Sequence, residues 1–225
     1  MRTKALLLTA ALGLAGAATS MAQAVYSVNV VGYINLTMKP GFNLVANQLK
    51  ASPNNGLNSV LPNANLASAV YKFSNATGNF TIDYSDGSAW FTPEGVPTTT
   101  TVSPGEGFFF FNPDSTDAGV TLVGEVTTGN NLQVSLPTGF SLVSSVVPQD
   151  IALTAANGFP QSVASQYMPY NTTAGAFDTY FNDGTGWFTA EGAPIDATVR
   201  VGQGFFYFNA GGASENWTRS FNPNN

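Results

Sequence analysis

The chain has 225 residues, of which 44% are hydrophobic and only 9% are charged, against about 25% charged in an average soluble domain. It contains no histidine and no cysteine. These absences exclude a Ser-His-Asp triad, a Cys-His pair, a disulfide framework and an acylated cysteine anchor, and they leave only carboxylates for a zinc site. The net charge is −6 and the few basic residues are scattered, which argues against nucleic-acid binding and against an anionic membrane surface.

Residues 1–24 have the pattern of a secretory signal peptide. Arg2 and Lys4 precede an uncharged apolar run, and Ala22-Gln23-Ala24 is an A-x-A cleavage site. We therefore expect an exported protein that begins at Val25 and is extracellular, on the cell surface or periplasmic. No later segment has about 18 consecutive apolar residues, so no transmembrane segment is predicted after cleavage.

Short segments rich in β-branched and aromatic residues follow along the chain, separated by many of the 13 prolines and 23 glycines. This pattern predicts short β strands. In chain order, the predicted strands are Val25–Val31, Tyr33–Met38, Phe42–Ala46, Val70–Phe73, Phe80–Tyr84, Ala89–Phe91, Phe108–Asn112, Val120–Val126, Phe140–Val146, Phe177–Phe181, Phe205–Asn209 and Trp217–Phe221. Short helical turns are predicted around Leu57–Leu61 and Ile151–Ala155.

An internal repeat is the strongest feature of the sequence. Asp86–Asn112 aligns without gaps with Asp183–Asn209, 97 residues later, and 16 of the 27 positions are identical. Gly41–Val45 recurs 98 residues later as Gly139–Val143. The repeat predicts an all-β protein of two abutting, pseudo-symmetric modules, each a sandwich or barrel. We place module one at residues 25–117 and module two at 118–225.

The strand-like segments beside the two repeats raise the question of which strands they pair with. Three similar strand-like segments, Val25–Val31, Val120–Val126 and Trp217–Phe221, accompany two modules. Two arrangements are open: the N-terminal strand pairs with the C-terminal strand of the same chain, or it adds to a neighbouring copy of the protein.

Aromatic residues that recur in both modules suggest a carbohydrate site. Trp90 and Trp187 each follow an Asp-Gly turn, and an exposed ring beside Asp, Asn and Glu side chains can stack on a sugar. The alternative is core packing, because neighbouring residues on a strand point to opposite faces. For the Phe108–Phe111 run we expect a strand covered on both faces, and for Gly105-Glu106-Gly107 close backbone packing before it, rather than a dinucleotide loop.

Carboxylates are the remaining candidates for chemistry. Glu94 and Glu191 occupy equivalent positions, as do Asp86 and Asp183. Two carboxylates about 5–10 Å apart would suit a carboxylate-dependent hydrolase. The alternative is that the two aspartates begin turns and the two glutamates lie in Glu-Gly loops.

Calcium binding is a second possible role for the acidic residues. Loop oxygens that could bind it come from Asp83 with Asp86 and from Asp178 with Asp183. Neither group matches a dense acidic calcium loop. No other cofactor is predicted.

The motifs VVGY, GFNLVAN and GEGFFFFN resemble a group of uncharacterised secreted bacterial β-repeat proteins. They are similar, more loosely, to bacterial surface modules with a GWNLISLP-like opening and a GxGYWV-like close. The resemblance covers nearly the whole chain after residue 24 and implies an exported β module. It brings no catalytic residues with it.

These observations predict a non-catalytic structural or adhesive protein of the cell surface or extracellular matrix. Its partners would be copies of itself, through edge strands, or surface glycans. A carbohydrate-binding module is the first alternative, and a carboxylate-dependent hydrolase is the second.

Overall fold

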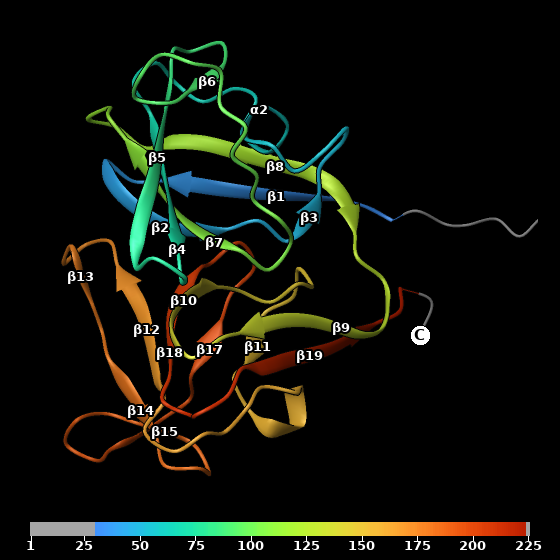
Figure 1. Cartoon of the computed structure of the whole chain (residues 1–225), viewed down its shortest axis with the longest axis vertical. Helices are drawn as coiled ribbons and strands as arrows, with labels where there is room; N and C mark the ends of the chain where they lie inside the picture. The colour runs from blue at the N-terminus through green and yellow to red at the C-terminus, as the bar shows by residue number, and fades with distance from the viewer. Residues whose placement is uncertain (1–29, 224–225) are drawn as a thin grey trace, which may run out of the picture.

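The computed structural model describes residues 30–223, whose regular secondary structure is almost entirely antiparallel β strand (Figure 1). This confirms the predicted all-β class. The first half contains β1 (Val31–Met38), β2 (Gly41–Ala46), β3 (Leu49–Lys50), α2 (Leu57–Val60), β4 (Ala69–Ser74), β5 (Asn79–Ser85), β6 (Trp90–Phe91), β7 (Gly107–Asn112) and β8 (Ala118–Val126). The predicted signal peptide and residues 25–29 lie outside the described part.

The second half repeats this order with more interruptions. It contains β9 (Gly129–Leu136), β10 (Gly139–Val143), β11 (Ile151–Ala152), the 3-10 turn η1 (Ala155–Asn157), β12 (Gln166–Asn171), β13 (Ala176–Phe177), β14 (Tyr180–Asn182), β15 (Trp187–Phe188), β16 (Pro194–Ile195), β17 (Thr198–Val199), β18 (Phe205–Asn209) and β19 (Glu215–Phe221). No helix within residues 30–223 is long and apolar enough to cross a membrane.

In the first half, two sheets lie one on the other. One has the order β1-β8-β3, and the other β2-β7-β4-β5-β6. Strand β1 shows why the sequence builds this layer. Ile34 and Met38 are buried, whereas Tyr33, which points to the opposite, outer face of the ribbon, is 69% exposed, as the two-residue period of a strand requires. The buried faces of both sheets share one apolar core that includes Ile34, Met38, Leu122, Val70, Phe108 and Phe110.

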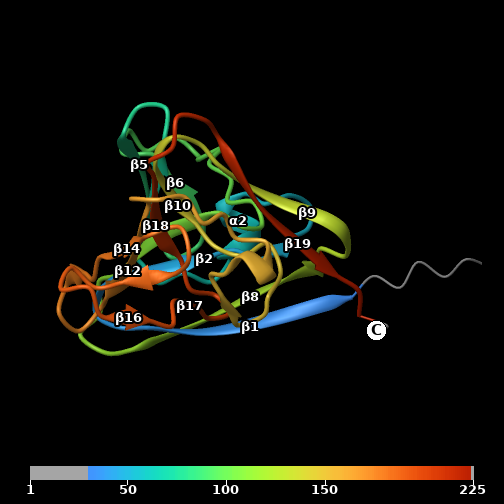
Figure 2. The ribbon, with the colours of Figure 1, turned by 90° about the horizontal axis from the view of Figure 1, so that it is seen from below.

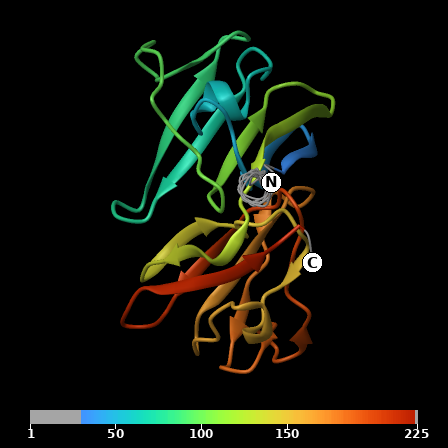
Figure 3. The same ribbon diagram turned by 90° about the vertical axis from the view of Figure 1, so that its right-hand side faces the viewer.

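The second half has equivalent layers. Strands β9 and β19 form a ribbon, and β10-β18-β12-β14-β15-β16 form the broader sheet, with β13 joined to β12. Trp217 of the ribbon and Phe205, Tyr207 and Trp187 of the sheet belong to a second core. Figure 1 and Figure 3 show the first half, blue to green, above the second half, yellow to red.

The first and the last described strands belong to different ribbons. Strand β1 pairs along its whole length with β8, and β19 pairs with β9; Figure 2 shows both ribbons from below. Residues 25–29 of the predicted N-terminal strand Val25–Val31 lie outside the described part, so both arrangements predicted for that strand stay predictions. Strand β9 was not predicted, because it opens on Gly129-Asn130-Asn131, residues that are poor strand formers.

The strand that follows the Gly-Glu-Gly motif is a central one. Strand β7 lies between β2 and β4, with Phe108 and Phe110 in the first core and Phe109 in a smaller cluster on the opposite face. This is the two-sided burial that the phenylalanine run predicts. A Cβ on Gly107 would lie only 3.1–3.2 Å from atoms of Leu142 and Val143, so this glycine serves close packing, as predicted.

The two copies of the repeat touch through equivalent backbone contacts. The amide of Ala46 donates to the carbonyl of Gly202 at 2.9 Å, and the amide of Ser144 donates to Gly105 at the same distance. Ala46 and Ser144 are equivalent residues of the repeat, and so are Gly105 and Gly202. Each copy therefore receives from the other the contact that it makes, which is the pattern of a local pseudo-twofold axis.

Candidate functional site

Both predicted sugar-stacking tryptophans belong to the core. Trp90 is 1% exposed and Trp187 is 3% exposed. Their indole N–H groups donate to backbone carbonyls, that of Trp90 to Leu61 at 3.0 Å and that of Trp187 to Leu153 at 2.8 Å. A buried ring has no free face for a sugar, so the expectation that these residues bind a glycan is wrong. The alternative prediction was that the two tryptophans pack in the core, and the structure places Trp90 in the first core and Trp187 in the second.

Asp86 and Asp183 begin turns. The Oδ1 atom of Asp86 accepts hydrogen bonds from the amides of Ser88 and Ala89 and from the Ser88 hydroxyl, each at 2.8 Å. Asp183 makes the equivalent set with Thr185 and Gly186. These donors hold the pKa of each carboxyl below its ordinary value. A turn with this hydrogen-bond pattern is a structural Asx turn.

Glu94 and Glu191 lie on exposed loops. A hydrogen bond from a threonine of the same loop, Thr92 or Thr189, lowers the pKa of each glutamate. A general acid of a glycoside hydrolase needs the opposite shift, toward neutral pH. The surroundings of these two glutamates therefore give no support to the hydrolase alternative.

The four candidate calcium ligands are not gathered. Asp83 is buried on β5, whereas Asp86, Asp178 and Asp183 are exposed. Within residues 30–223 no group of three or more acidic side chains is placed to hold a metal ion. The Asp83 carboxylate has no hydrogen-bond partner among the described residues.

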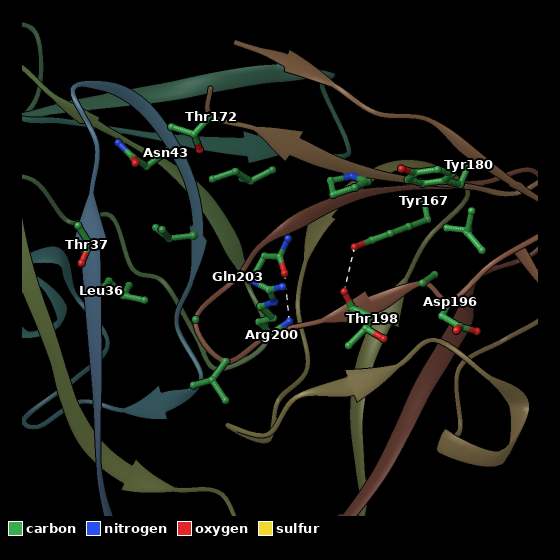
Figure 4. A pocket seen from close by; sticks show the side chains of 17 residues that line it. Leu36, Thr37, Asn43, Tyr167, Thr172, Tyr180, Asp196, Thr198, Arg200 and Gln203 are labelled. Atoms are coloured by element: carbon green, nitrogen blue, oxygen red, sulfur yellow. Dashed lines mark hydrogen bonds between the residues drawn. The ribbon is translucent and has the colours of Figure 1, made fainter. Parts of the chain in front are cut away.

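A cleft of about 620 Å³ lies between the two copies of the repeat. In Figure 4, β1 with Leu36 and Thr37 forms one side of this cleft, Tyr167 and Tyr180 form the other, and Arg200 lies between them. Further polar side chains on its surface are Asn43, Thr172, Asp196, Thr198 and Gln203. The volume lies within the range of about 300–1,000 Å³ that ligand pockets usually have.

The two copies differ at one position on the inner face of the sheet, beside the cleft. In the first copy, Lys72 of β4 extends its ammonium group to the carbonyl of Thr101 at 2.6 Å and to the carboxylate of Glu106 at 3.1 Å. The equivalent residue of β12 is Pro169, which lines the cleft. Proline has neither the length nor the charge to fill that space.

Three other substitutions change the charge of the same region. Tyr180 stands where the first copy has the buried Asp83, and Gln203 stands where it has Glu106. Arg200 replaces Ser103. Relative to the first copy, the cleft has therefore lost two carboxylates and one ammonium group and has gained a guanidinium. Asp196, which replaces Thr99, is the acidic residue that lines it.

Hydrogen bonds and stacking hold the walls of the cleft in place. The Arg200 amide donates to Oε1 of Gln203 at 3.1 Å, and the hydroxyl of Tyr167 donates to the Thr198 carbonyl at 3.3 Å. The rings of Tyr167 and Tyr180 are stacked, with centroids 5.9 Å apart. Burial raises the pKa of Tyr167 far above its ordinary value, so this hydroxyl is a neutral donor at any physiological pH. The guanidinium of Arg200 is exposed and has no ion pair within residues 30–223.

An aromatic surface is the second notable feature. The outer faces of the two broad sheets carry Phe42, Phe80, Phe140 and Phe177, which are 39–46% exposed. We call this set the aromatic face. Beside Phe42 and Phe80 is an apolar hollow of about 240 Å³, which is also lined by Tyr71, Phe109 and Tyr170.

The aromatic face continues into the contact between the two copies. Phe73 packs edge-on against Phe206 with ring centroids 5.0 Å apart, and Phe109 packs against Tyr170 at 5.2 Å. Leu44, Phe109 and Leu142 form the buried centre of this contact. Rings of the same kind are therefore buried between the copies and exposed beside them.

Sequence reasoning missed both features for identifiable reasons. Most of the predicted site residues recur in the two copies, whereas several residues that line the cleft differ between the copies, such as Arg200 against Ser103 and Pro169 against Lys72. An alignment read for its differences would have found them. The aromatic face could not be found in this way, because the sequence does not say which face of each sheet is covered.

Comparison of the chain with models of known protein families, with curated proteins and with solved structures gives no match. The resemblance to secreted bacterial β-repeat proteins therefore stays a prediction from the motifs.

Proposed function

We propose that this chain is an exported, non-catalytic structural or adhesive protein that associates with copies of itself through its aromatic face. The observation that carries the proposal is the exposure of four phenylalanine rings next to a contact that buries the same kind of ring. Large exposed apolar surfaces on an otherwise well-packed protein mark interaction sites.

The chemistry of the surface favours a second copy as the occupant. None of the residues that line the hollow beside Phe42 and Phe80 is charged, so the surface offers no complement to an acidic or basic partner. Edge-to-face contacts already join Phe73 to Phe206 across the two halves of one molecule. The same geometry can repeat between molecules, because aromatic pairs of this kind add about 0.5–1.5 kcal/mol each beyond the area they bury.

Two features of the sequence support export and a non-catalytic role. Residues 1–24 have the signal pattern, and the chain lacks histidine and cysteine. The carboxylates considered for hydrolysis have lowered pKa values on exposed loops. A structural or adhesive role therefore fits a low-charge β protein with an exposed aromatic surface better than a catalytic role does.

The first prediction concerns association in solution. We expect sedimentation velocity to show oligomers whose fraction grows with protein concentration. The double variant Phe42→Lys/Phe140→Lys changes equivalent exposed positions in the two copies and should be monomeric, because each lysine would have to lose its hydration in the contact.

The matched control is Tyr33→Lys/Val123→Lys, which places two lysines on the outer face of the β1–β8 ribbon, where both residues are exposed. It should associate like the unchanged protein. A wild-type protein that stays monomeric up to millimolar concentration, or a Phe42→Lys/Phe140→Lys variant that is folded by circular dichroism and still associates, would contradict the proposal. Loss of association in the control alone would place the contact on the ribbon instead.

A further inference from the structure

We infer that the cleft between the two copies of the repeat binds a saccharide that carries a carboxylate group, such as a uronic acid unit. The guanidinium of Arg200 would pair with the carboxylate. Tyr180 and the polar side chains of the walls would contact the ring and its hydroxyls. This site is distinct from the aromatic face and does not depend on self-association.

Arg200 indicates the charge of the ligand. The described basic residues other than Lys50 and Arg200 are engaged: Lys39 pairs with Asp117, Lys72 pairs with Glu106, and Arg219 is buried against Ser145 and Gln149. Arg200 lines a cleft, is exposed and has no ion pair within residues 30–223. A guanidinium is the side chain best shaped to hold a carboxylate through two parallel hydrogen bonds.

The other walls indicate a ligand with hydroxyl groups. The Nε2 atom of Gln203 and the hydroxyls of Thr37, Thr172 and Tyr180 make no hydrogen bonds with other described residues, yet each side chain lines the cleft. The carboxylate of Asp196 is likewise without a partner in the described structure. A simple anion would be repelled by Asp196 and by a protein of net charge −6. The hydroxyl groups of a polyhydroxylated anion can donate hydrogen bonds to the Asp196 carboxylate, and these bonds offset the repulsion.

The first copy of the repeat serves as an internal comparison. There the ammonium of Lys72 bridges Thr101 and Glu106, and Ser103 stands in place of Arg200. The equivalent space is thus occupied by a salt bridge of the protein itself. In the second copy, Pro169 and Gln203 remove that bridge, and Arg200 adds a cation that has no ion pair among the described residues. One copy keeps a structural tie where the other has room for a ligand.

Isothermal titration calorimetry with trigalacturonate as the probe tests the inference. We expect binding to the wild-type protein at pH 7 that weakens as salt is added. The variant Arg200→Gln should bind at least about tenfold more weakly, because a hydrogen-bonded charge pair is lost. The matched control Lys50→Gln removes the same charge from β3, outside the cleft, and should bind like the wild type.

A second variant uses the design of the first copy. Pro169→Lys/Gln203→Glu should recreate the bridge of Lys72 and Glu106 inside the cleft and abolish binding, while circular dichroism and thermal unfolding report an intact fold. Undiminished binding by Arg200→Gln, or an absence of wild-type binding at millimolar trigalacturonate, would overturn the inference.

Two further probes separate the parts of the ligand. Neutral galactotriose lacks the carboxylates, and glutarate has carboxylates without hydroxyls; both should bind at least about tenfold more weakly than trigalacturonate. Equal binding of galactotriose would refute the role of Arg200, and equal binding of glutarate would refute the saccharide. Because sedimentation reports association and calorimetry reports the ligand, failure of one proposal is distinguishable from failure of the other.

Discussion

At the scale of single residues, the core tryptophans are identical in the two copies, whereas several residues that line the cleft differ. Trp90 and Trp187 are kept in both copies and are buried in the two cores. Arg200 has no basic counterpart and reaches the surface of the cleft. The physical reason is that a packed core tolerates few changes of volume, whereas a solvated cleft tolerates a change of charge.

The role of Trp90 can be measured. We expect Trp90→Ala to lower the free energy of unfolding by about 3–5 kcal/mol, because it leaves a large cavity in the first core. It also leaves the carbonyl of Leu61 without its donor. Chemical denaturation compared with Tyr33→Ala, an exposed aromatic that should cost no more than about 0.5 kcal/mol, gives the contrast. Similar small losses in the two variants would mean that Trp90 is not a core residue.

At the scale of elements, equivalent turns hold equivalent hairpins. The Asp86 turn connects β5 with β6, and the Asp183 turn connects β14 with β15. In each, one carboxylate oxygen accepts hydrogen bonds from two backbone amides and one hydroxyl of the turn, and one backbone hydrogen bond also closes the turn. The ionised form of the aspartate is therefore the form that the folded turn favours, and its pKa falls below 3.8.

This coupling predicts a pH dependence. A carboxyl whose pKa is lower in the folded than in the unfolded state stabilises the fold above the unfolded pKa, near 4, and loses that contribution as the pH falls through the folded value. The stability difference between wild type and Asp86→Ala/Asp183→Ala should thus be largest at pH 6 and shrink toward pH 2. Urea denaturation at both pH values measures it. An unchanged difference would show that the turns do not depend on ionisation.

At the scale of the whole molecule, the two copies are held together by backbone contacts that leave no room for side chains. A Cβ on Gly204 would lie 2.6 Å from the carbonyl oxygen of Val45 and 3.4 Å from the Cα atom of Gly107. Val45 and Gly107 belong to the first copy, whereas Gly204 belongs to the second. The contact is therefore specified by the smallness of glycine at the start of β18 as well as by apolar burial.

Gly204→Ala tests this contact. We expect a loss of about 1–3 kcal/mol, the usual range for overpacking, because backbone cannot move aside as a flexible side chain can. Gly119→Ala is the matched control, since a Cβ there meets no atom within 4 Å, and it should leave stability unchanged or raise it slightly. Thermal unfolding of both variants provides the comparison. A Gly204→Ala protein as stable as the control would mean that the copies can separate without cost.

Several features could be read from the sequence because they depend on local patterns. The phenylalanine run Phe108–Phe111 indicated a strand covered on both sides. The repeat itself indicated equivalent contacts in the two halves. Strand β9 escaped because its glycine and asparagine residues give no strand signal, although its pairing with β19 stabilises it.

By itself, the sequence determined the all-β class, the repeated strands and the absence of histidine and cysteine chemistry, because composition and two-residue periodicity are properties of neighbouring residues. Only the tertiary structure decided that the tryptophans are buried, that β1 pairs with β8, and that Arg200 and Tyr180 line the same cleft. Those outcomes depend on which faces of distant strands cover one another. Packing between distant segments decides that, and no local pattern records it.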